Sequence, residues 1–283
     1  ATYVGAPVST THSIVGGVMG GGIAAAGFGI VAWGTMGKIA ASWVISPVLG
    51  GVIAAGFLYF IKTQIVHKED MLENAKKIVP ILIGIMTVAF ATYLMLKGIK
   101  KIVKIDFPTA LALGSAIGVA IYFVVKPLIA KASEKLENTK VSVNSLFTIP
   151  LIFAAALLSF AHGANDVANA IGPLAAINDA IMSGGEFGGK VGIPIWVMGV
   201  GAVGIAIGLA LYGPKLIRTV GSEITELDQM RAFSIAMAAA ITVIIASQLG
   251  LPVSSTHIAV GGVFGVGFLR EFLDNSETNF IRI

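Results

Sequence analysis

The chain has 283 residues, of which 56% are hydrophobic and only 12% are charged, and its mean hydropathy is +0.90. Soluble domains carry about 25% charged residues, so this composition excludes an ordinary cytosolic enzyme, a disordered chain and a secreted disulfide scaffold. The absence of cysteine excludes disulfides, thiolate metal sites and cysteine nucleophiles. The net charge of +4 comes from basic residues in short loops, which argues against nucleic acid as a partner. We therefore predict an all-α polytopic membrane protein embedded in a lipid bilayer.

Charged loops separate a series of apolar segments along the chain. About 20 apolar residues in a helix cross the ~30 Å hydrocarbon core of a bilayer. We expect Pro47 to interrupt the second segment, and the stretch Leu251–His257 lies in the middle of the last one. The segments predicted to enter the membrane are 13–33, 39–61, 78–96, 109–125, 146–177, 193–213 and 232–269.

The basic residues of the loops predict how the protein is oriented. If each segment crosses once, the loops Lys62–Lys77, Lys126–Ser145 and Pro214–Arg231 lie on the same side and hold 4 + 4 + 3 = 11 Lys and Arg residues. The loops of the opposite side hold 5. Because cytoplasmic loops of membrane proteins are enriched in Lys and Arg, we expect the first set in the cytoplasm. The prediction is a multi-pass protein of the cell (inner) membrane.

Two segments of the chain repeat one another at an offset of 245 residues. Pro7–Ala24 (PVSTTHSIVGGVMGGGIA) and Pro252–Leu269 (PVSSTHIAVGGVFGVGFL) are identical at 11 of 18 positions. A shared Gly-rich composition does not explain the common Pro-Val-Ser-x-Thr-His, so we infer a duplication. Duplicated halves are a recurring plan of secondary transporters, with the substrate bound where the repeats meet.

The offset also predicts how the chain divides. The first copy of His162–Pro173 would begin before residue 1, and the second copy of Ile39–Ile61 would occupy 284–306. We therefore expect this sequence to be an interior part of a longer protein. Residues 1–66 would end the first repeat, 67–145 would be linking helices and a cytoplasmic loop, and 146–283 would form an incomplete second repeat.

Asp166 is the one acidic residue inside a predicted membrane segment. An ionised carboxylate is costly there and usually faces a cavity or an ion path. Together with the amide oxygens of Asn165 and Asn169, it forms a set of hard oxygen ligands suited to Na⁺. The alternative is a neutral or paired Asp166 that only holds helices together.

A helix break near Asp166 would add backbone carbonyl oxygens to such a cation site. Gly163, Gly172 and Pro173 lie close to it in the sequence and predict a break in the helix that carries it.

The two Pro-Val-Ser-x-Thr-His segments predict helix N-termini in the middle of the membrane. A helix N-terminus presents unpaired N–H groups and a positive dipole end, which together favour an anion. Neither segment contains Lys or Arg, so a bound anion would need a co-bound cation to balance its charge. The alternative is simple helix capping, which contributes about 1 kcal/mol per cap. The candidate hydroxyl donors are Ser9, Thr10, Thr11, Ser254, Ser255 and Thr256.

The histidines of these motifs are expected to play a supporting role. His12, His162 and His257 are placed to orient the segments by hydrogen bonding. By residue type alone, Ser254, His257 and Asp166 could form the catalytic triad of a hydrolase. The sequence contains no nucleophile elbow, however. The protein is therefore not expected to be an enzyme.

At this point the motifs resemble a known family. HGANDVANAIGP (162–173), PVSSTHIAVGG (252–262) and PVSTTHSIVGG (7–17) are similar to motifs of the PiT family of inorganic phosphate transporters. The resemblance covers nearly the whole chain. It implies an inverted-repeat transporter with broken or re-entrant helices, a symporter that imports phosphate with Na⁺ or H⁺, no tightly bound cofactor, and a homodimer.

The resemblance also implies roles for individual residues. Asn165, Asp166 and Asn169 would serve the cation, and the first two also phosphate. The hydroxyls of Ser9–Thr11 and Ser254–Thr256 would hold phosphate. The sequence departs from the family pattern because its first Asn-Asp motif and its closing helix are missing.

Other ligands and roles stay open at this point. Hydroxyls and backbone N–H groups bind sulfate as well as phosphate, although only phosphate can donate a proton to Asp166 at neutral pH. The neighbouring asparagines favour Na⁺, whereas His162, one helical turn from Asp166, allows H⁺ as the coupling ion. A membrane sensor or scaffold that does not transport is the remaining alternative.

Overall fold

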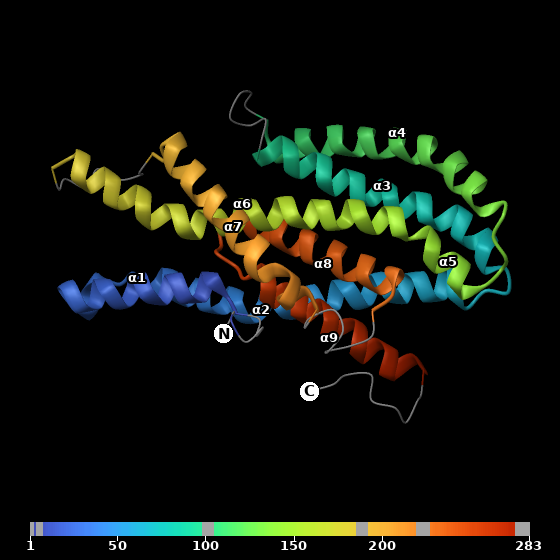
Figure 1. Cartoon of the computed structure of the whole chain (residues 1–283), viewed down its shortest axis with the longest axis horizontal. Coiled ribbons are helices and arrows are strands. Elements are labelled where there is room, and N and C mark those ends of the chain that lie inside the picture. Colours follow the sequence, from blue (N-terminus) through green and yellow to red (C-terminus); the bar gives the residue numbers. More distant parts are fainter. Residues whose placement is uncertain (1–2, 4–7, 98–104, 185–191, 219–226, 275–283) are drawn as a thin grey trace.

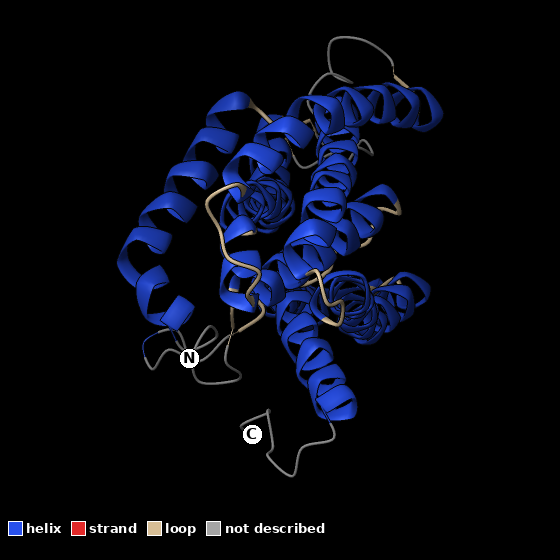
Figure 2. Ribbon diagram, turned by 90° about the vertical axis from the view of Figure 1, so that its right-hand side faces the viewer, coloured by secondary structure: helices blue, strands red, loops and turns tan. Residues whose placement is uncertain are grey.

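The computed structural model describes residues 3, 8–97, 105–184, 192–218 and 227–274. These residues form helices joined by short connections, and no strand occurs among them (Figure 2). The all-α prediction is confirmed. The elements are α1 (Thr10–Ala26), η2 (Phe28–Ile30), α2 (Trp33–Ile61), η3 (Lys62–Val66), α3 (Met71–Lys97), α4 (Phe107–Ser133), α5 (Lys140–Leu146), α6 (Thr148–Met182), α7 (Ile195–Arg218), α8 (Gln229–Gln248) and α9 (Ser255–Asp274).

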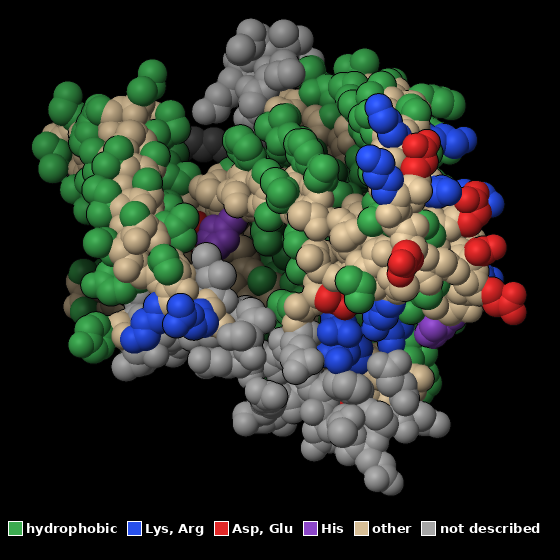
Figure 3. All heavy atoms as spheres, turned by 45° about the vertical axis from the view of Figure 1, so that its right-hand side comes forward, with side chains coloured by type: hydrophobic (Ala, Val, Ile, Leu, Met, Phe, Trp, Pro, Cys, Tyr) green, Lys and Arg blue, Asp and Glu red, His purple; other side chains and the backbone are tan. Residues whose placement is uncertain are grey.

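Six of these helices are long and apolar enough to cross a membrane. Their surfaces support that assignment, because only 6% of the most apolar stretch of α7 is buried inside the protein. Exposing the remaining apolar side chains to water would be costly. Charged side chains gather mainly at one end of the molecule, beside broad apolar surfaces (Figure 3). The six segments are Trp33–Val66, Met71–Leu96, Phe107–Ser133, Thr148–Met182, Ile195–Lys215 and Gln229–Gln248.

Of the three helix breaks predicted from the sequence, the structure contains one and lacks two. The segment 232–269 divides as expected, because α8 ends at Gln248 and α9 begins at Ser255. The breaks expected at Pro47 and near Gly163, Gly172 and Pro173 were wrong, since α2 and α6 run through them without interruption. A proline removes one hydrogen bond from a helix, and packing on the remaining turns can hold the helix together across that gap.

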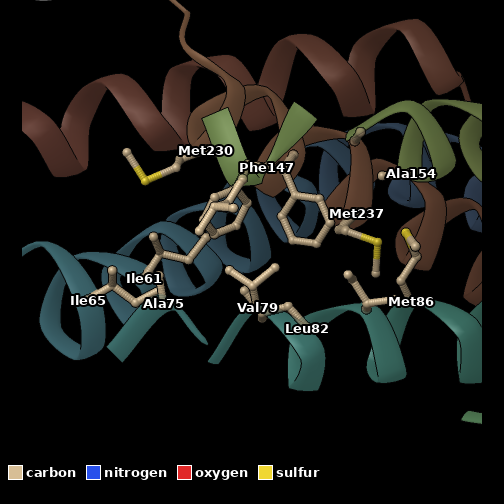
Figure 4. Packing of buried hydrophobic residues seen from close by; sticks show 14 of the residues in the cluster. Ile61, Ile65, Ala75, Val79, Leu82, Met86, Phe147, Ala154, Met230 and Met237 are labelled. Carbon is tan, nitrogen blue, oxygen red and sulfur yellow. The ribbon is translucent and has the colours of Figure 1, made fainter. Parts of the chain in front are cut away.

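The core lies where α2, α3, α6 and α8 meet. Phe147, just before α6, is fully buried, and its ring centroid lies 5.6 Å from that of Phe233 in α8. Figure 4 shows Phe147 surrounded by residues of α2, α3 and α8, such as Ile61, Val79 and Met237. This packing fixes α6 and α8, the helices on either side of the candidate site.

Two asparagines join three connections at the end of the molecule that carries α5 (Figure 1). Asn138 donates from Nδ2 to Glu69 O (2.7 Å) and accepts from Leu72 N (2.9 Å). Asn144 accepts from Met230 N (3.1 Å). The connections before α3, before α5 and before α8 therefore lie on one side, as expected if each apolar segment crosses the membrane once.

Glycines let α9 and α2 touch backbone to backbone. A Cβ atom added to Gly265 would overlap the carbonyl of Gly51, and one added to Gly51 would lie 2.9 Å from Gly261 O. Helices in lipid are not driven together by the hydrophobic effect, and close van der Waals contact holds them instead. Small residues such as glycine allow that close contact. The contact holds the start of α9 against α2.

We predict that Gly265→Leu lowers the stability of the protein markedly, because its side chain must push two backbones apart. Overpacking of this kind costs about 1–3 kcal/mol. Gly56→Leu, on the same pair of helices, is the control, since nothing lies within 4 Å of its Cβ position. Thermal unfolding in detergent, followed by circular dichroism, measures both variants. Equal midpoints would contradict the packing described here.

Candidate functional site

The two repeated segments begin their helices in the same way. Ser9 is the N-cap of α1, and its Oγ accepts a hydrogen bond from His12 N (3.1 Å). Ser254 precedes α9, and its Oγ accepts from His257 N (3.2 Å). Both serines are buried. Helix capping is thus their observed role, and it leaves the other first-turn N–H groups of each helix available to an anion.

The starts of α1 and α9 meet at the carbonyl of Val253. Thr11 Oγ1 donates to this oxygen at 3.2 Å, although the two residues are 242 positions apart. Asn165 of α6 donates to the same oxygen from Nδ2 at 3.0 Å. Asn169, one turn further along α6, donates to Thr11 Oγ1 at 2.9 Å. From this point α1 and α9 run in opposite directions (Figure 1), so two positive helix ends converge beside α6.

These bonds determine which way the two amides point. Thr11 uses its proton on Val253 O and can therefore only accept from Asn169, which identifies the group facing it as NH₂. Asn165 faces a carbonyl, which also requires NH₂. Among the described residues, no hydrogen bond engages the amide oxygen of either asparagine, so both oxygens can face a cation.

Asp166 belongs to α6, and its side chain lies beside the N-terminus of α9. This side chain is only 12% exposed. Its Oδ2 lies 2.8 Å from His162 Nε2 and 3.5 Å from Ser255 Oγ. Its Oδ1 accepts from Asn165 Nδ2 at 3.2 Å. A buried carboxylate needs such partners, and these donors leave further oxygen lone pairs for a small cation.

Pro173 lies inside α6, which does not break there. Proline has no N–H, so the helix offers no donor at position 173 for the carbonyl of Asn169, four residues earlier.

An aromatic cluster joins the two helix starts on another side. The ring of His12 lies 3.9 Å from the Trp43 ring and 4.6 Å from the His257 ring, centroid to centroid. Trp43 donates from Nε1 to Pro252 O at 3.1 Å. His162 binds Asp166 as expected, whereas His12 and His257 contact each other through their rings. Trp43 lies outside the motifs that the sequence analysis singled out.

Some predicted residues lie outside the cluster. Thr10 is exposed, and among the described residues no hydrogen bond joins Thr10 or Thr256 to the other members. The described residues contain no group of three or more His, Asp or Glu side chains that could hold a metal ion. A cation would therefore rely on one carboxylate with amide and backbone oxygens. The backbone carbonyl of Val253, the centre of the cluster, carried no sequence signal because its side chain is apolar.

An open cavity of about 470 Å³ adjoins this cluster between α1 and α6. Asn169 and Pro173 line it on the α6 side, and Ile14 and Val18 on the α1 side. Most of the lining is apolar. The cavity gives the amide of Asn169 an opening toward the surface of the described structure.

The described structure combines helices long enough to cross a membrane with two helix N-termini that meet beside the carboxylate of Asp166. This is the architecture of an integral membrane transporter. Residues 1–282 match the Phosphate transporter family, and the chain belongs to that family. The family resemblance predicted from the motifs is thereby confirmed.

Individual relatives agree with this assignment. The chain is 57% identical to a Helicobacter pylori (strain J99) protein named "Putative phosphate permease", which it matches over its whole length and over 54% of the relative. It is 36% identical to "Inorganic phosphate transporter 2-1, chloroplastic" of Arabidopsis thaliana, covering 95% of the chain and 50% of the relative. The chain thus spans about half the length of these curated relatives.

A solved structure described as "The sodium-dependent phosphate transporter" has a similar fold. The TM-score is 0.86 at 38% sequence identity, covering 95% of this chain and 66% of that one. This similarity confirms the transporter fold.

We predict that Thr11→Val lowers the free energy of unfolding by about 1–3 kcal/mol, because the valine leaves the buried NH₂ of Asn169 without its acceptor. Thr10→Val, at the adjacent exposed position, should change it by less than about 0.5 kcal/mol. Denaturant titration in detergent compares the two variants. If they were equally stable, Thr11 would not join α1, α6 and α9.

Proposed function

We propose that the protein is a secondary symporter that carries inorganic phosphate across a membrane together with Na⁺. The meeting of two helix N-termini with Asp166 is the observation that carries this proposal. The name of the structural neighbour, a sodium-dependent phosphate transporter, supports both the substrate and the ion.

The proposed binding site divides between a cation and an anion. Na⁺ binds Asp166 and the free amide oxygens of Asn165 and Asn169. Phosphate accepts hydrogen bonds from the first-turn N–H groups of α1 and α9 and from nearby hydroxyls. These hydroxyls belong to Ser9, Thr10, Thr11, Ser254, Ser255 and Thr256, of which Thr11 and Ser255 lie nearest to the amides and to Asp166.

Charge sets the order of binding. Without Na⁺, the carboxylate of Asp166 repels a phosphate anion, and in a site shielded from water this repulsion is strong. Na⁺ binding neutralises it, and phosphate then enters between the positive ends of α1 and α9. The two repeats rock around the loaded site, as inverted-repeat transporters do.

Phosphate is favoured over sulfate by the carboxylate. At neutral pH phosphate still carries a proton that it can donate to Asp166, whereas sulfate carries none. Sulfate permease activity of the same fold is therefore the weaker alternative. Excess sulfate should leave phosphate uptake nearly unchanged, and strong competition would favour the sulfate alternative.

Several broader features form part of the same proposal. The protein lies in the cell (inner) membrane, with the end of the molecule that carries Asn138 and Asn144 in the cytoplasm. Residues 1–66 and 146–283 belong to two repeats joined by 67–145, and the identical caps at Ser9 and Ser254 support that division. The protein assembles as a homodimer, as the family resemblance implies.

We expect Asp166→Asn to reduce phosphate uptake at least a hundredfold, because the amide removes the charge that binds Na⁺. Asp179→Asn, on the same helix and outside the cluster, is the control and should retain uptake. Radiolabelled phosphate uptake into proteoliposomes under a Na⁺ gradient measures both. Parental uptake by Asp166→Asn would refute its role, and saturable phosphate binding without flux in the unmodified protein would favour a sensor or scaffold.

His162 provides the test of the coupling ion. If Na⁺ is coupled, a Na⁺ gradient alone drives uptake, a pH gradient alone does not, and His162→Gln retains most of the Na⁺-driven uptake. Glutamine keeps a hydrogen-bond donor near Asp166 but cannot exchange protons near neutral pH. Uptake driven by a pH gradient and abolished in His162→Gln would instead indicate proton coupling.

A further inference from the structure

The contact between α2 and α9 repeats turn by turn. A Cβ atom added to Gly50 would lie 2.8 Å from Ile258 Cγ2, and one added to Gly262 would lie 3.7 Å from Ala54 Cβ. Each of these pairs joins a residue to one 208 positions later in the chain, and the two pairs are four residues apart along each helix. Since four residues make about one helical turn, the same faces of α2 and α9 stay in contact from one turn to the next.

The row of facing residues ends in two positive charges. Leu58 and Val266 follow one turn later and belong to one buried cluster. Lys62 and Arg270 follow one turn after them, again 208 positions apart. Lys62 is only 7% exposed, and Arg270 is only 5% exposed. Two like charges therefore occupy facing positions at the end of a buried helix contact, where little water screens their repulsion.

Arg231 brings a third positive charge to this end of the contact. It lies one turn before Ile235 of α8, which belongs to the same buried cluster as Leu58 and Val266. The side chain of Arg231 is 13% exposed, and its Nε lies 3.5 Å from Oδ2 of Asp228, the N-cap of α8. The last turn of α2 and the first turn of α8 lie at the same end of the molecule (Figure 1).

These three basic side chains have the chemistry that binds a phosphate group. The planar fork of arginine pairs with two phosphate oxygens, and lysine adds a compact positive charge. Asp228 and Glu271, which follows Arg270 in the sequence, supply carboxylates at this end. Arginine and lysine only donate hydrogen bonds and have several N–H groups each, so they bind such carboxylates and a further anion at the same time. An anion between Lys62 and Arg270 also relieves the repulsion of the two like charges.

We propose that Lys62, Arg231 and Arg270 form a second anion site, which binds the phosphate group of inorganic phosphate or of an anionic phospholipid. Arg270 lies 15 residues beyond Ser255 in α9, about 22 Å along the helix axis, so this site is separate from the one around Asp166. Its positive charges are fixed side chains, and binding therefore needs no Na⁺. A bound phosphate group joins α2, α8 and α9 at their shared end.

The test measures binding of radiolabelled inorganic phosphate to the chain by equilibrium dialysis, in a maltoside detergent with K⁺ in place of Na⁺. We expect saturable binding that weakens about tenfold or more in Arg270→Gln and in Lys62→Gln, because each loses charge-assisted hydrogen bonds to phosphate. Lys77→Gln, whose parent side chain is 67% exposed, is the control and should bind like the parent. Asp166→Asn should also bind like the parent in this assay, so the outcome does not depend on the transport mechanism proposed above.

Two further measurements distinguish lost binding from lost folding. Circular dichroism of each variant without phosphate should show a thermal midpoint equal to that of the parent or higher, because one of two facing like charges has been removed. Arg270→Lys keeps the positive charge but loses the fork, and it should fold normally and bind phosphate more weakly than the parent.

The source of the phosphate group is decided by repeating the titration with labelled phosphatidylglycerol in the same micelles. Binding of inorganic phosphate alone supports free phosphate as the ligand, and tighter binding of phosphatidylglycerol, weakened by the same two glutamine variants, supports a lipid headgroup. The proposal is overturned if neither ligand binds, or if both glutamine variants bind like the parent. Loss of binding in Asp166→Asn would also overturn it, since the phosphate would then occupy the site at the helix starts.

Discussion

The carbonyl of Val253 accepts hydrogen bonds from both Thr11 and Asn165, and the rest of the candidate site depends on this shared acceptor. A chain that stops one helix and starts another inside a membrane exposes backbone groups that lipid cannot satisfy. Here the exposed carbonyl is satisfied by side chains from two other helices. Satisfying that one oxygen brings α1, α6 and the start of α9 together, and it aligns the amides of α6 as it does so.

The same constraint explains why the described part of the site contains no lysine or arginine. Two helix N-termini supply partial positive charge without the desolvation cost of a lysine or arginine. In the proposed mechanism, such a site needs a mobile cation beside Asp166 to balance the charge of the anion. That dependence is what couples the movement of one ion to that of the other in the proposed mechanism.

Glycine packing provides the stiffness that a broken helix lacks. Backbone contact between α2 and α9 at Gly51 and Gly261 fixes the direction of α9 immediately after its start. The aromatic rings of His12, Trp43 and His257 fill the space between the two helix starts on that side. The proposed transport cycle needs rigid helices on either side of the site, and these contacts would supply that rigidity.

The sequence was sufficient to predict the all-helical membrane fold and to single out the repeated motifs and Asp166 as candidates. Each of these follows from a cost that is local to the sequence: polar groups and charges are expensive in lipid, so their rarity marks them. The helix breaks at Pro47 and Pro173 were predicted wrongly, because whether a proline bends or ends a helix depends on what packs around it.

The role of Val253 could not be predicted, because its carbonyl is chemically the same as every other in the chain. Only the tertiary structure places it where a hydroxyl and an amide from distant segments can reach it. The sequence by itself determined which polar residues lie in the membrane, since that depends on composition alone. The tertiary structure decided which of them meet, since Thr11 and Asn169 are brought together by helix packing across 158 residues.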